Sequence, residues 1–222
     1  MTVSVYSSAS DGTEGGDICY VATCKNAIIT RIGLCDVQGH GSHVSAIANN
    51  MYRAVRNSMN RIPGHRVLSE LNQILNQQGS PAYSTAAVIT FNVHNSRLYF
   101  SYAGHPAILL RQEAEEQWSC PVSRSGGQGA NFPLGMFPFT RYNQDSVALR
   151  SGDRLALYSD GVVEAESKTG EVFGTKRLAA VLESCREYDL SYARDRTIHE
   201  LELYSSGAPR ADDQTLILIE VG

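Results

Sequence analysis

Four strand-like runs of the sequence each carry aspartate at one end. The acids are Asp17 before residues 18–22, Asp36 after residues 32–35, Asp160 after residues 155–159, and the pair Asp212 and Asp213 before residues 214–219. An unpaired carboxylate inside a core is costly, so each acid alone is a turn former, a helix cap or a metal ligand, and aspartate is a common turn residue. Four such runs together indicate that strands bring several carboxylates to one edge of a sheet. Crowded carboxylates repel one another unless cations lie between them.

The elements that must position these acids follow from the periodicity of apolar residues. Apolar residues three or four apart predict helices, and short apolar runs between turn residues predict strands. The predicted strands are residues 2–6, 18–23, 27–34, 85–93, 97–102, 107–110, 142–149, 154–159 and 215–221, and the predicted helices are residues 42–61, 65–77, 175–184 and 191–204. This order predicts an α+β fold with mostly antiparallel sheet and helices outside it.

The composition is that of one globular domain, with 42% hydrophobic and 19% charged residues among 222. Residues 1–14 are polar and small, and we expect them to be partly flexible. The net charge of −4 and the absence of a Lys/Arg run argue against nucleic acid or an anionic membrane as the main partner. No apolar run is long enough to span a bilayer, and the N-terminus is not a signal peptide. Five scattered cysteines fit a reduced, cytoplasmic protein.

Seven short motifs occur in an order that is more specific than any one of them. They are Gly15-Gly16-Asp17, Asp36-Val37-Gln38-Gly39-His40-Gly41, Ala103-Gly104-His105-Pro106, Leu134-Gly135-Met136, Ser151-Gly152-Asp153, Tyr158-Ser159-Asp160-Gly161 and Asp212-Asp213-Gln214-Thr215. This order resembles the metal-dependent protein phosphatases (the PPM family), and most of all their bacterial SpoIIE/RsbU-like branch. The resemblance implies a single domain over residues 1–222. It also implies a four-layer α-β-β-α sandwich of two stacked, mainly antiparallel sheets flanked by helix pairs.

The resemblance also implies a role for each acid in binding two divalent cations. Asp36 would bind both ions, and Val37 would contribute its main-chain carbonyl as a further ligand. Asp160 and Asp212 would complete the coordination of one ion, and Asp17 would bind the other. Asp213 would lie behind the metal ligands, and Gly161 would let the chain turn after Asp160. On this basis the identity of the Val37 side chain should matter little. A ligand set of carboxylate and carbonyl oxygens selects magnesium or manganese.

Two histidines and one tyrosine have interpretations that the sequence leaves open. His40 could protonate the leaving serine oxygen or only hold the Gly39–Gly41 turn, and the turn is favoured. His105 could be catalytic, but an imidazole in a Gly-His-Pro corner more often satisfies buried backbone groups. Tyr20 stands where family members often carry a second acid, which predicts a changed environment around the metals without loss of activity.

The chemistry implied by the resemblance is hydrolysis of phosphoserine or phosphothreonine by a water that the two cations activate. The substrate would be a phosphorylated regulatory protein, either an antagonist of an anti-sigma factor or a stress-signalling scaffold, and a homodimer or a regulatory partner would control activity. Two other functions remain open. One is a phosphatase-fold module that binds phosphorylated regulators with weak or no catalysis, and the other is a hydrolase acting on a small phosphate ester or nucleotide.

Overall fold

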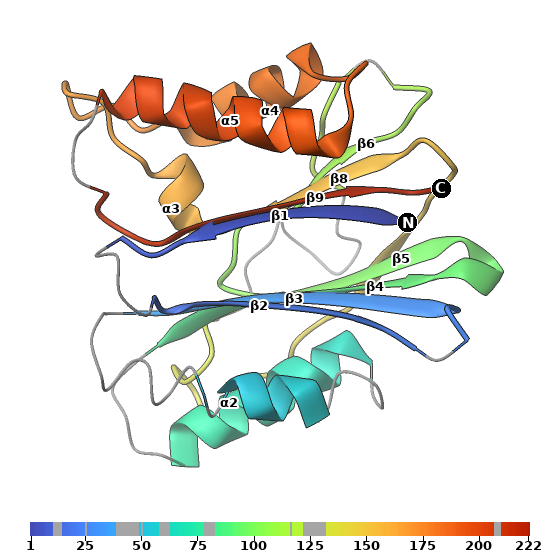
Figure 1. Ribbon diagram of the computed structural model, residues 1–222. Coiled ribbons are helices and arrows are strands. Elements are labelled where there is room, and N and C mark those ends of the chain that lie inside the picture. The colour runs from blue at the N-terminus through green and yellow to red at the C-terminus, as the bar shows by residue number, and fades with distance from the viewer. Residues whose placement is uncertain are drawn as a thin grey trace. The chain divides into compact units, whose positions relative to one another are not determined.

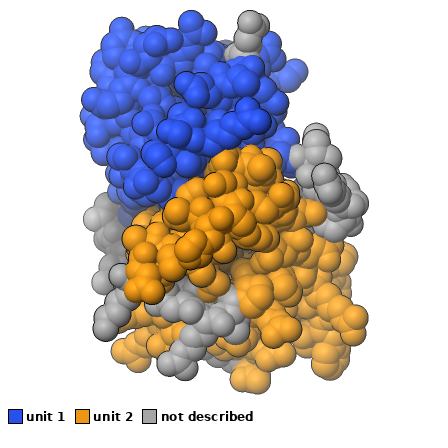
Figure 2. Space-filling model, turned by 90° about the vertical axis from the view of Figure 1, so that its right-hand side faces the viewer, with its two compact units in different colours: residues 1–13, 108–121, 150–222 blue, residues 14–107, 122–149 orange. Residues whose placement is uncertain are grey.

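The chain forms two compact units in the computed structural model, which describes residues 1–10, 15–24, 26–38, 49, 51–57, 63–77, 83–115, 117–121, 132–206 and 210–222. Unit 1 comprises residues 1–13, 108–121 and 150–222, and unit 2 comprises residues 14–107 and 122–149. Figure 2 colours the two units separately. Among the described residues, no helix is long and apolar enough to cross a bilayer.

Unit 2 contains a five-stranded antiparallel sheet in the order β2-β3-β4-β5-β7 (Figure 1). The strands are β2 (Asp17–Thr23), β3 (Ile29–Val37), β4 (Ser84–Asn92), β5 (Arg97–Ala103) and β7 (Asp145–Ala148). Strands β2 and β3 are consecutive antiparallel neighbours, and β4 is joined to its antiparallel neighbour β5 through a 3-10 turn, η1 (Val93–Asn95). Ser96 adopts the left-handed backbone conformation that closes this turn, with φ of 50°.

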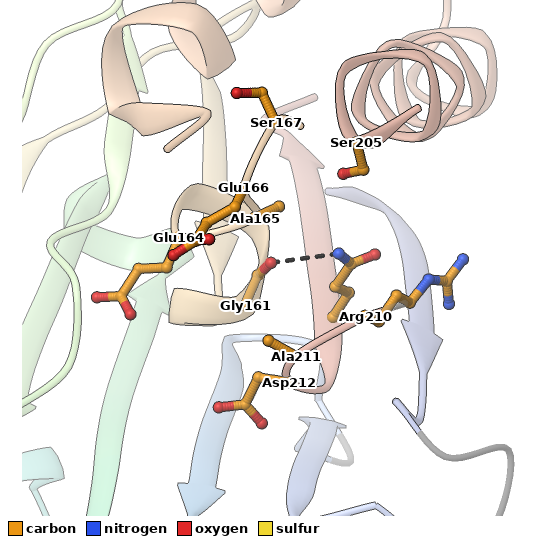
Figure 3. A pocket seen from close by; sticks show the side chains of 10 residues that line it. Gly161, Glu164, Ala165, Glu166, Ser167, Ser205, Arg210, Ala211 and Asp212 are labelled. Atoms are coloured by element: carbon orange, nitrogen blue, oxygen red, sulfur yellow. Dashed lines mark hydrogen bonds between the residues drawn. The ribbon is translucent and has the colours of Figure 1, made fainter. Parts of the chain in front are cut away.

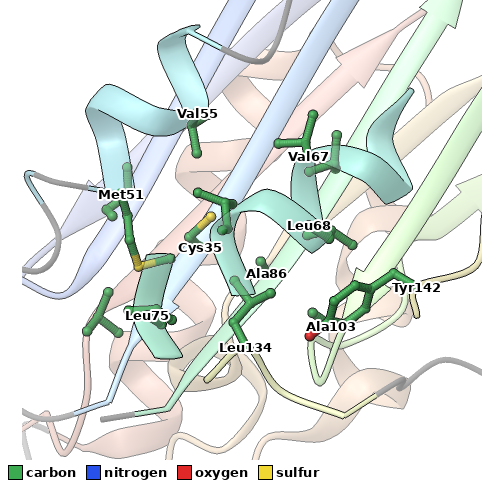
Figure 4. Packing of buried hydrophobic residues seen from close by; sticks show 14 residues of the cluster. Cys35, Met51, Val55, Val67, Leu68, Leu75, Ala86, Ala103, Leu134 and Tyr142 are labelled. Atoms are coloured by element: carbon green, nitrogen blue, oxygen red, sulfur yellow. The ribbon is translucent and has the colours of Figure 1, made fainter. Parts of the chain in front are cut away.

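Helix α2 (Gly64–Gln77) covers one face of this sheet (Figure 1). Val67, Leu68, Leu71 and Leu75 are buried at the predicted three- and four-residue spacing. Residue 49 and residues 51–57 are also helical, which confirms those parts of the helix predicted at 42–61; the rest of it lies outside the described residues. Figure 4 shows the helical side chains packed on Cys35, Ala86 and other strand residues. Each fully buried Leu or Val contributes about 1.5–3 kcal/mol of transfer free energy, so this stripe fixes the helix on the sheet.

Unit 1 contains a four-stranded antiparallel sheet in the order β1-β9-β8-β6. Its elements are β1 (Thr2–Ser8), β6 (Leu109–Arg111), β8 (Arg154–Tyr158), α3 (Asp160–Val163), α4 (Gly174–Ser184), α5 (Leu190–Ser205) and β9 (Gln214–Glu220). Helices α4 and α5 lie on one face of the sheet (Figure 1). Their buried residues, including Leu178, Leu182 and Leu201, form one apolar cluster with Leu216 and Leu218 of β9. Each unit is thus a sheet with helices packed on a face, as the α+β prediction requires.

Three local predictions differ in detail from the structure. Residues 109–111 form β6, which pairs with β8 and does not extend the run at 97–102. The strand predicted at 142–149 is ordered as β7 only over Asp145–Ala148. Within the segment expected to be partly flexible, residues 2–8 form β1 and pair with β9 along their whole length. A local pattern shows that a strand is present, but its partner depends on the rest of the fold.

Candidate metal centre

Asp17 and Asp36 stand directly opposite each other in unit 2. Asp17 is the first residue of β2, Asp36 is the penultimate residue of β3, and the antiparallel register pairs the two. Directly opposed residues have Cβ atoms about 4.5–5.5 Å apart on the same face of a sheet, and like charges in this position are destabilising. Asp36 is also only 8% exposed. A cation between the two carboxylates would remove the repulsion, so the local geometry suits a divalent ion.

The backbone beside this pair is closely packed around Val37. The Val37 N–H donates to the Gly16 carbonyl oxygen at 3.3 Å. A Cβ added to Gly16 would lie 2.5 Å from the Val37 carbonyl oxygen, so only glycine allows the approach. The Ser84 hydroxyl donates to the Asp36 carbonyl oxygen at 2.6 Å and holds the end of β3. These contacts fix the orientation of the main-chain oxygen that was predicted to bind metal.

The side chain of Val37 corrects one expectation. It is 1% exposed and belongs to the apolar cluster under α2, together with Cys35 and Leu75. Its identity therefore matters for stability, even though the predicted metal ligand is the main-chain carbonyl. This burial was not predicted, because the turn that follows Val37 is polar.

Asp160 and Asp212 form a second carboxylate pair, in unit 1. Asp160 begins α3 directly after β8, and Asp212 lies two residues before β9 begins. Because β8 and β9 are antiparallel neighbours, the end of one strand meets the start of the other. Burial raises the pKa of the Asp160 carboxyl, and the nearby charges of Asp212 and Glu164 raise it further. The two acids are thus close enough to repel, as the predicted binding of one ion by both requires.

Hydrogen bonds connect the turn after β8 to the segment before β9. The Ser159 hydroxyl donates to the Asp213 carbonyl oxygen at 3.3 Å, and the Thr215 N–H donates to the same hydroxyl at 2.9 Å. The Gln214 side-chain amide donates to the Gly161 carbonyl oxygen at 3.3 Å, the bond that Figure 3 draws. A Cβ at Gly161 would clash with the Asp213 carbonyl, so the turn comes this close only because residue 161 is glycine.

Asp212 and Asp213 differ in what their carboxylates face. Asp213 is 7% exposed, and its Oδ1 accepts a hydrogen bond from the Ser10 N–H at 2.8 Å. Asp212 is exposed, and its Oδ1 accepts from the Asp213 N–H at 2.8 Å. Asp213 therefore anchors the segment after β1, whereas Asp212 keeps a carboxylate oxygen available to a ligand. This difference agrees with ranking Asp212 above Asp213 as a metal ligand.

A pocket of about 290 Å³ adjoins Asp212 within unit 1. Figure 3 shows its lining side chains, which come from α3 and the loop after it, the end of α5, and the segment before β9. They include Glu164, Glu166, Ser205 and Arg210. Arg210 donates to the Ser8 hydroxyl at 2.5 Å and pairs with Glu202 at 3.5 Å. None of these four was predicted to line a site; for Glu164 and Glu166 the reason is that residues 164–173 carry only the signals of a surface loop.

The remaining predicted residues divide into those described and those outside the description. His40 lies outside the described residues, so its two interpretations stay predictions. Tyr20 is half-buried and packs edge-on against Tyr52, with ring centroids 6.2 Å apart. His105 is 2% exposed, and its Nδ1–H donates to the Pro106 carbonyl oxygen at 2.9 Å. Burial lowers the His105 pKa to about 4, so the ring is a neutral, buried corner residue, as the favoured interpretation requires.

The predicted metal ligands therefore form two pairs, one in each unit. Within the described part of the chain, no group of three or more His, Cys, Asp or Glu side chains has the geometry of a metal site. Each pair consists of oxygen donors only, next to the Val37 carbonyl in unit 2 and the Gly161 turn in unit 1. This donor chemistry suits magnesium or manganese.

Comparison with solved structures defines the class of fold. The SiaA-PP2C domain of Pseudomonas aeruginosa matches with a TM-score of 0.85 and 19% identity, over 99% of this chain and 85% of that one. RsbX in complex with magnesium matches with a TM-score of 0.70 and 16% identity, over 97% of this chain and 92% of that one. The chain therefore has the fold of the PP2C-type phosphatases, and the predicted fold class is confirmed.

The chain belongs to the SpoIIE family. The family model for Stage II sporulation protein E matches residues 29–222. Phosphoserine phosphatase RsbP of Bacillus subtilis (strain 168) is 21% identical over 194 residues, which cover 85% of this chain and 45% of RsbP. The chain thus spans about half the length of this curated relative. The predicted membership of the SpoIIE/RsbU-like branch of the PPM phosphatases is confirmed.

Proposed function

We propose that this chain hydrolyses phosphoserine or phosphothreonine in a regulatory protein, using two manganese or magnesium ions. The observation that carries the proposal is the pairing of Asp17 with Asp36 across β2 and β3, beside the closely packed Val37 carbonyl. Membership of the SpoIIE family and similarity to RsbP support the reaction class. The structure of RsbX with magnesium supports the choice of metal.

Both carboxylate pairs would take part in the reaction. Asp36 would bridge the ions, Asp17 would bind one of them, and Asp160 with Asp212 would bind the other. When bound, the ions supply a water of lowered pKa as nucleophile and neutralise charge on the phosphoryl oxygens. No serine or cysteine nucleophile is then required.

The residues around the acids hold them in position. Ser84 and Gly16 fix the end of β3, and Ser159 with Gln214 fixes the turn that presents Asp160. Preorganised ligands matter because a misplacement of about 1 Å can cost on the order of 100-fold in rate. The pocket beside Asp212 would take the residues that flank the phosphorylated side chain, and Glu166 on its wall would favour a basic residue among them.

The substrate proposed is a phosphorylated antagonist of an anti-sigma factor or a stress-signalling scaffold protein. Similarity to RsbP, which is named a phosphoserine phosphatase, supports a substrate that carries phosphoserine. Control by a regulatory partner or a second copy of the chain, and a cytoplasmic location, are predictions that accompany the proposal.

Manganese-dependent phosphate release tests the reaction. Purified protein should hydrolyse p-nitrophenyl phosphate and a phosphoserine protein, and Asp36→Asn and Asp160→Asn should each lose at least about 100-fold in rate. Asp195→Asn is the matched control, because Asp195 is an exposed acid that pairs only with the neighbouring Arg194 among the described residues. Wild-type rates in either site variant would refute the assignment of the acids.

Binding without turnover would favour the alternative function. In that outcome the immobilised protein would retain a phosphorylated partner on a column and release no phosphate with manganese present. The Asp36→Asn variant would bind the same partner with unchanged affinity. Faster hydrolysis of nucleotides or small phosphate esters than of phosphoproteins would favour the small-molecule hydrolase.

A further inference from the structure

Arg31 is a buried cation that the catalytic proposal does not use. It lies on β3 and is 9% exposed. Its Nε and Nη1 atoms are buried and form no hydrogen bond, and no described carboxylate forms an ion pair with it. An arginine stays protonated in proteins, and an unpaired buried charge is costly. A group that compensates this charge is therefore expected beside it.

The face of the sheet that carries Arg31 is the one that α2 covers. Side chains alternate along a strand, so Arg31 shares a face with Cys35 and Val37, which pack under α2. The register places Thr90 of β4 directly beside Arg31, and Tyr99 of β5 directly beside Thr90. These three residues form one row across the sheet.

A pocket of about 240 Å³ opens over this row. Its lining residues are Ile29, Arg31, Pro63, Gly64, Thr90, Asn92, Tyr99 and Gln144. The lining residues combine one guanidinium with hydroxyl and amide groups, and none of them is an acid. All of them belong to unit 2.

The N-terminus of α2 adds positive potential to the same pocket. Gly64 is the first residue of this 14-residue helix, and its N–H donates to the Gln144 side-chain oxygen at 3.1 Å. The first turn of α2 contains no acidic residue. A helix N-terminus attracts anions through its N–H groups and its dipole. Because no acidic side chain in the first turn of α2 opposes this effect, the positive potential is available to a bound anion.

We infer that this pocket binds a phosphoryl group, with Arg31 as the principal ligand. A guanidinium binds phosphate oxygens through two parallel N–H donors, and the pocket has room for a group of this size. The phosphoryl group could belong to free phosphate or to a phosphorylated residue of a peptide. Arg31 precedes Asp36 by five residues on the same strand, which corresponds to about 16 Å at 3.3 Å per residue. The pocket is therefore separate from the carboxylate pair, and the inference does not depend on the phosphatase activity.

Binding to metal-free protein isolates this pocket from the candidate metal centre. With EDTA present, titration of wild-type protein with inorganic phosphate, followed by calorimetry and by NMR of the backbone amides, should give saturable binding. The Gly64 amide should shift. Arg31→Gln should weaken binding by about tenfold or more, the loss expected for a charge-assisted hydrogen bond. A second titration uses a phosphoserine peptide, with its unphosphorylated form as the control. Tighter binding of the phosphopeptide than of free phosphate would identify a docking site for phosphorylated protein. Tighter binding of free phosphate would identify a site for the free ion.

Arg97→Gln is the matched control variant. Arg97 lies on the same face of the sheet, but its Nε and Nη2 donate to the Ser146 hydroxyl at 3.3 and 3.0 Å, and it does not line the pocket. The affinity of the Arg97→Gln variant for phosphate should stay within about twofold of wild type. Should Arg31→Gln fail to fold, Arg31→Lys keeps the charge without the paired donors and should still weaken binding. Absence of saturable binding by either probe, or equal affinity in wild type and the Arg31 variants, would overturn the inference.

Discussion

Replacement of Gly161 by alanine should separate the two acids of unit 1. A Cβ at this position would clash with the Asp213 carbonyl oxygen and lie 3.0 Å from its carbonyl carbon. Both contacts are with backbone, so no side-chain rotation relieves them. The first turn of α3, which carries Asp160, must then move away from the segment that carries Asp212.

The size of the effect follows from the size of the clash. A shift of roughly 1 Å would restore a normal contact, and such a misplacement of a catalytic group costs on the order of 100-fold in rate. Overpacking at a single site costs about 1–3 kcal/mol in stability. The variant should therefore remain folded at low temperature but lose most of its activity, and the metal concentration for half-maximal rate should rise.

Gly170→Ala provides the matched control for this substitution. Gly170 has φ of +78°, but an added Cβ would meet nothing within 4 Å. Alanine there costs about 1–2 kcal/mol from the left-handed backbone alone and should leave the rate unchanged. Initial rates of p-nitrophenyl phosphate hydrolysis across a manganese titration, with urea denaturation of the same samples, measure both effects. A Gly161→Ala rate within twofold of wild type would contradict the argument.

Three further predictions concern stability. Val37→Ala should lower the free energy of unfolding by about 2 kcal/mol, because a buried side chain is truncated, yet the rate per folded molecule should change little; urea denaturation and initial rates check both. The His105 pKa falls from 6.5 to about 4 on burial, so the stability due to its neutral form is complete above pH 6.5. It should be lost by about 3 kcal/mol as the pH falls towards 4; a pH series of urea denaturations should show this slope in wild type and lose it in His105→Asn. Manganese should raise the melting temperature in proportion to the logarithm of its concentration, EDTA should reverse the rise, and Asp17→Asn should reduce it; an equal rise in that variant would exclude Asp17 as a ligand.

The sequence predicted the elements whose patterns are long or regular. The stripe of Val67, Leu68, Leu71 and Leu75 predicted α2 to within one residue, since a 14-residue amphipathic helix repeats its period several times. Residues 18–23 and 27–34 predicted the β2–β3 hairpin, which places Asp17 opposite Asp36. Helix α3 was missed because four residues, Asp160–Val163, are too short to show a helical period.

The surroundings of the candidate site were less accessible to sequence reasoning. The motif order predicted which acids are candidate ligands, but not that Asp213 anchors Ser10, since a contact across 203 positions leaves no local pattern. Arg31 stood within an apolar run, where one charged residue is usually exposed on the solvent side of a strand. Its burial depends on which face α2 covers, and the helix position is a property of the packed fold.

The strand order of unit 1 has a consequence for protein synthesis. Strand β9 lies between β1 and β8, and Val3 of β1 pairs with Ile219 of β9. On the ribosome, β1 emerges before β9, and the strands and helices that lie between them in the sequence are all translated before the two can pair. Distant pairings of this kind form slowly, and incomplete sheets expose edges that aggregate. A chain released before residue 212 would leave β1 and β8 without a common neighbour and would lack Asp212, so such prematurely terminated copies could not assemble the proposed catalytic centre.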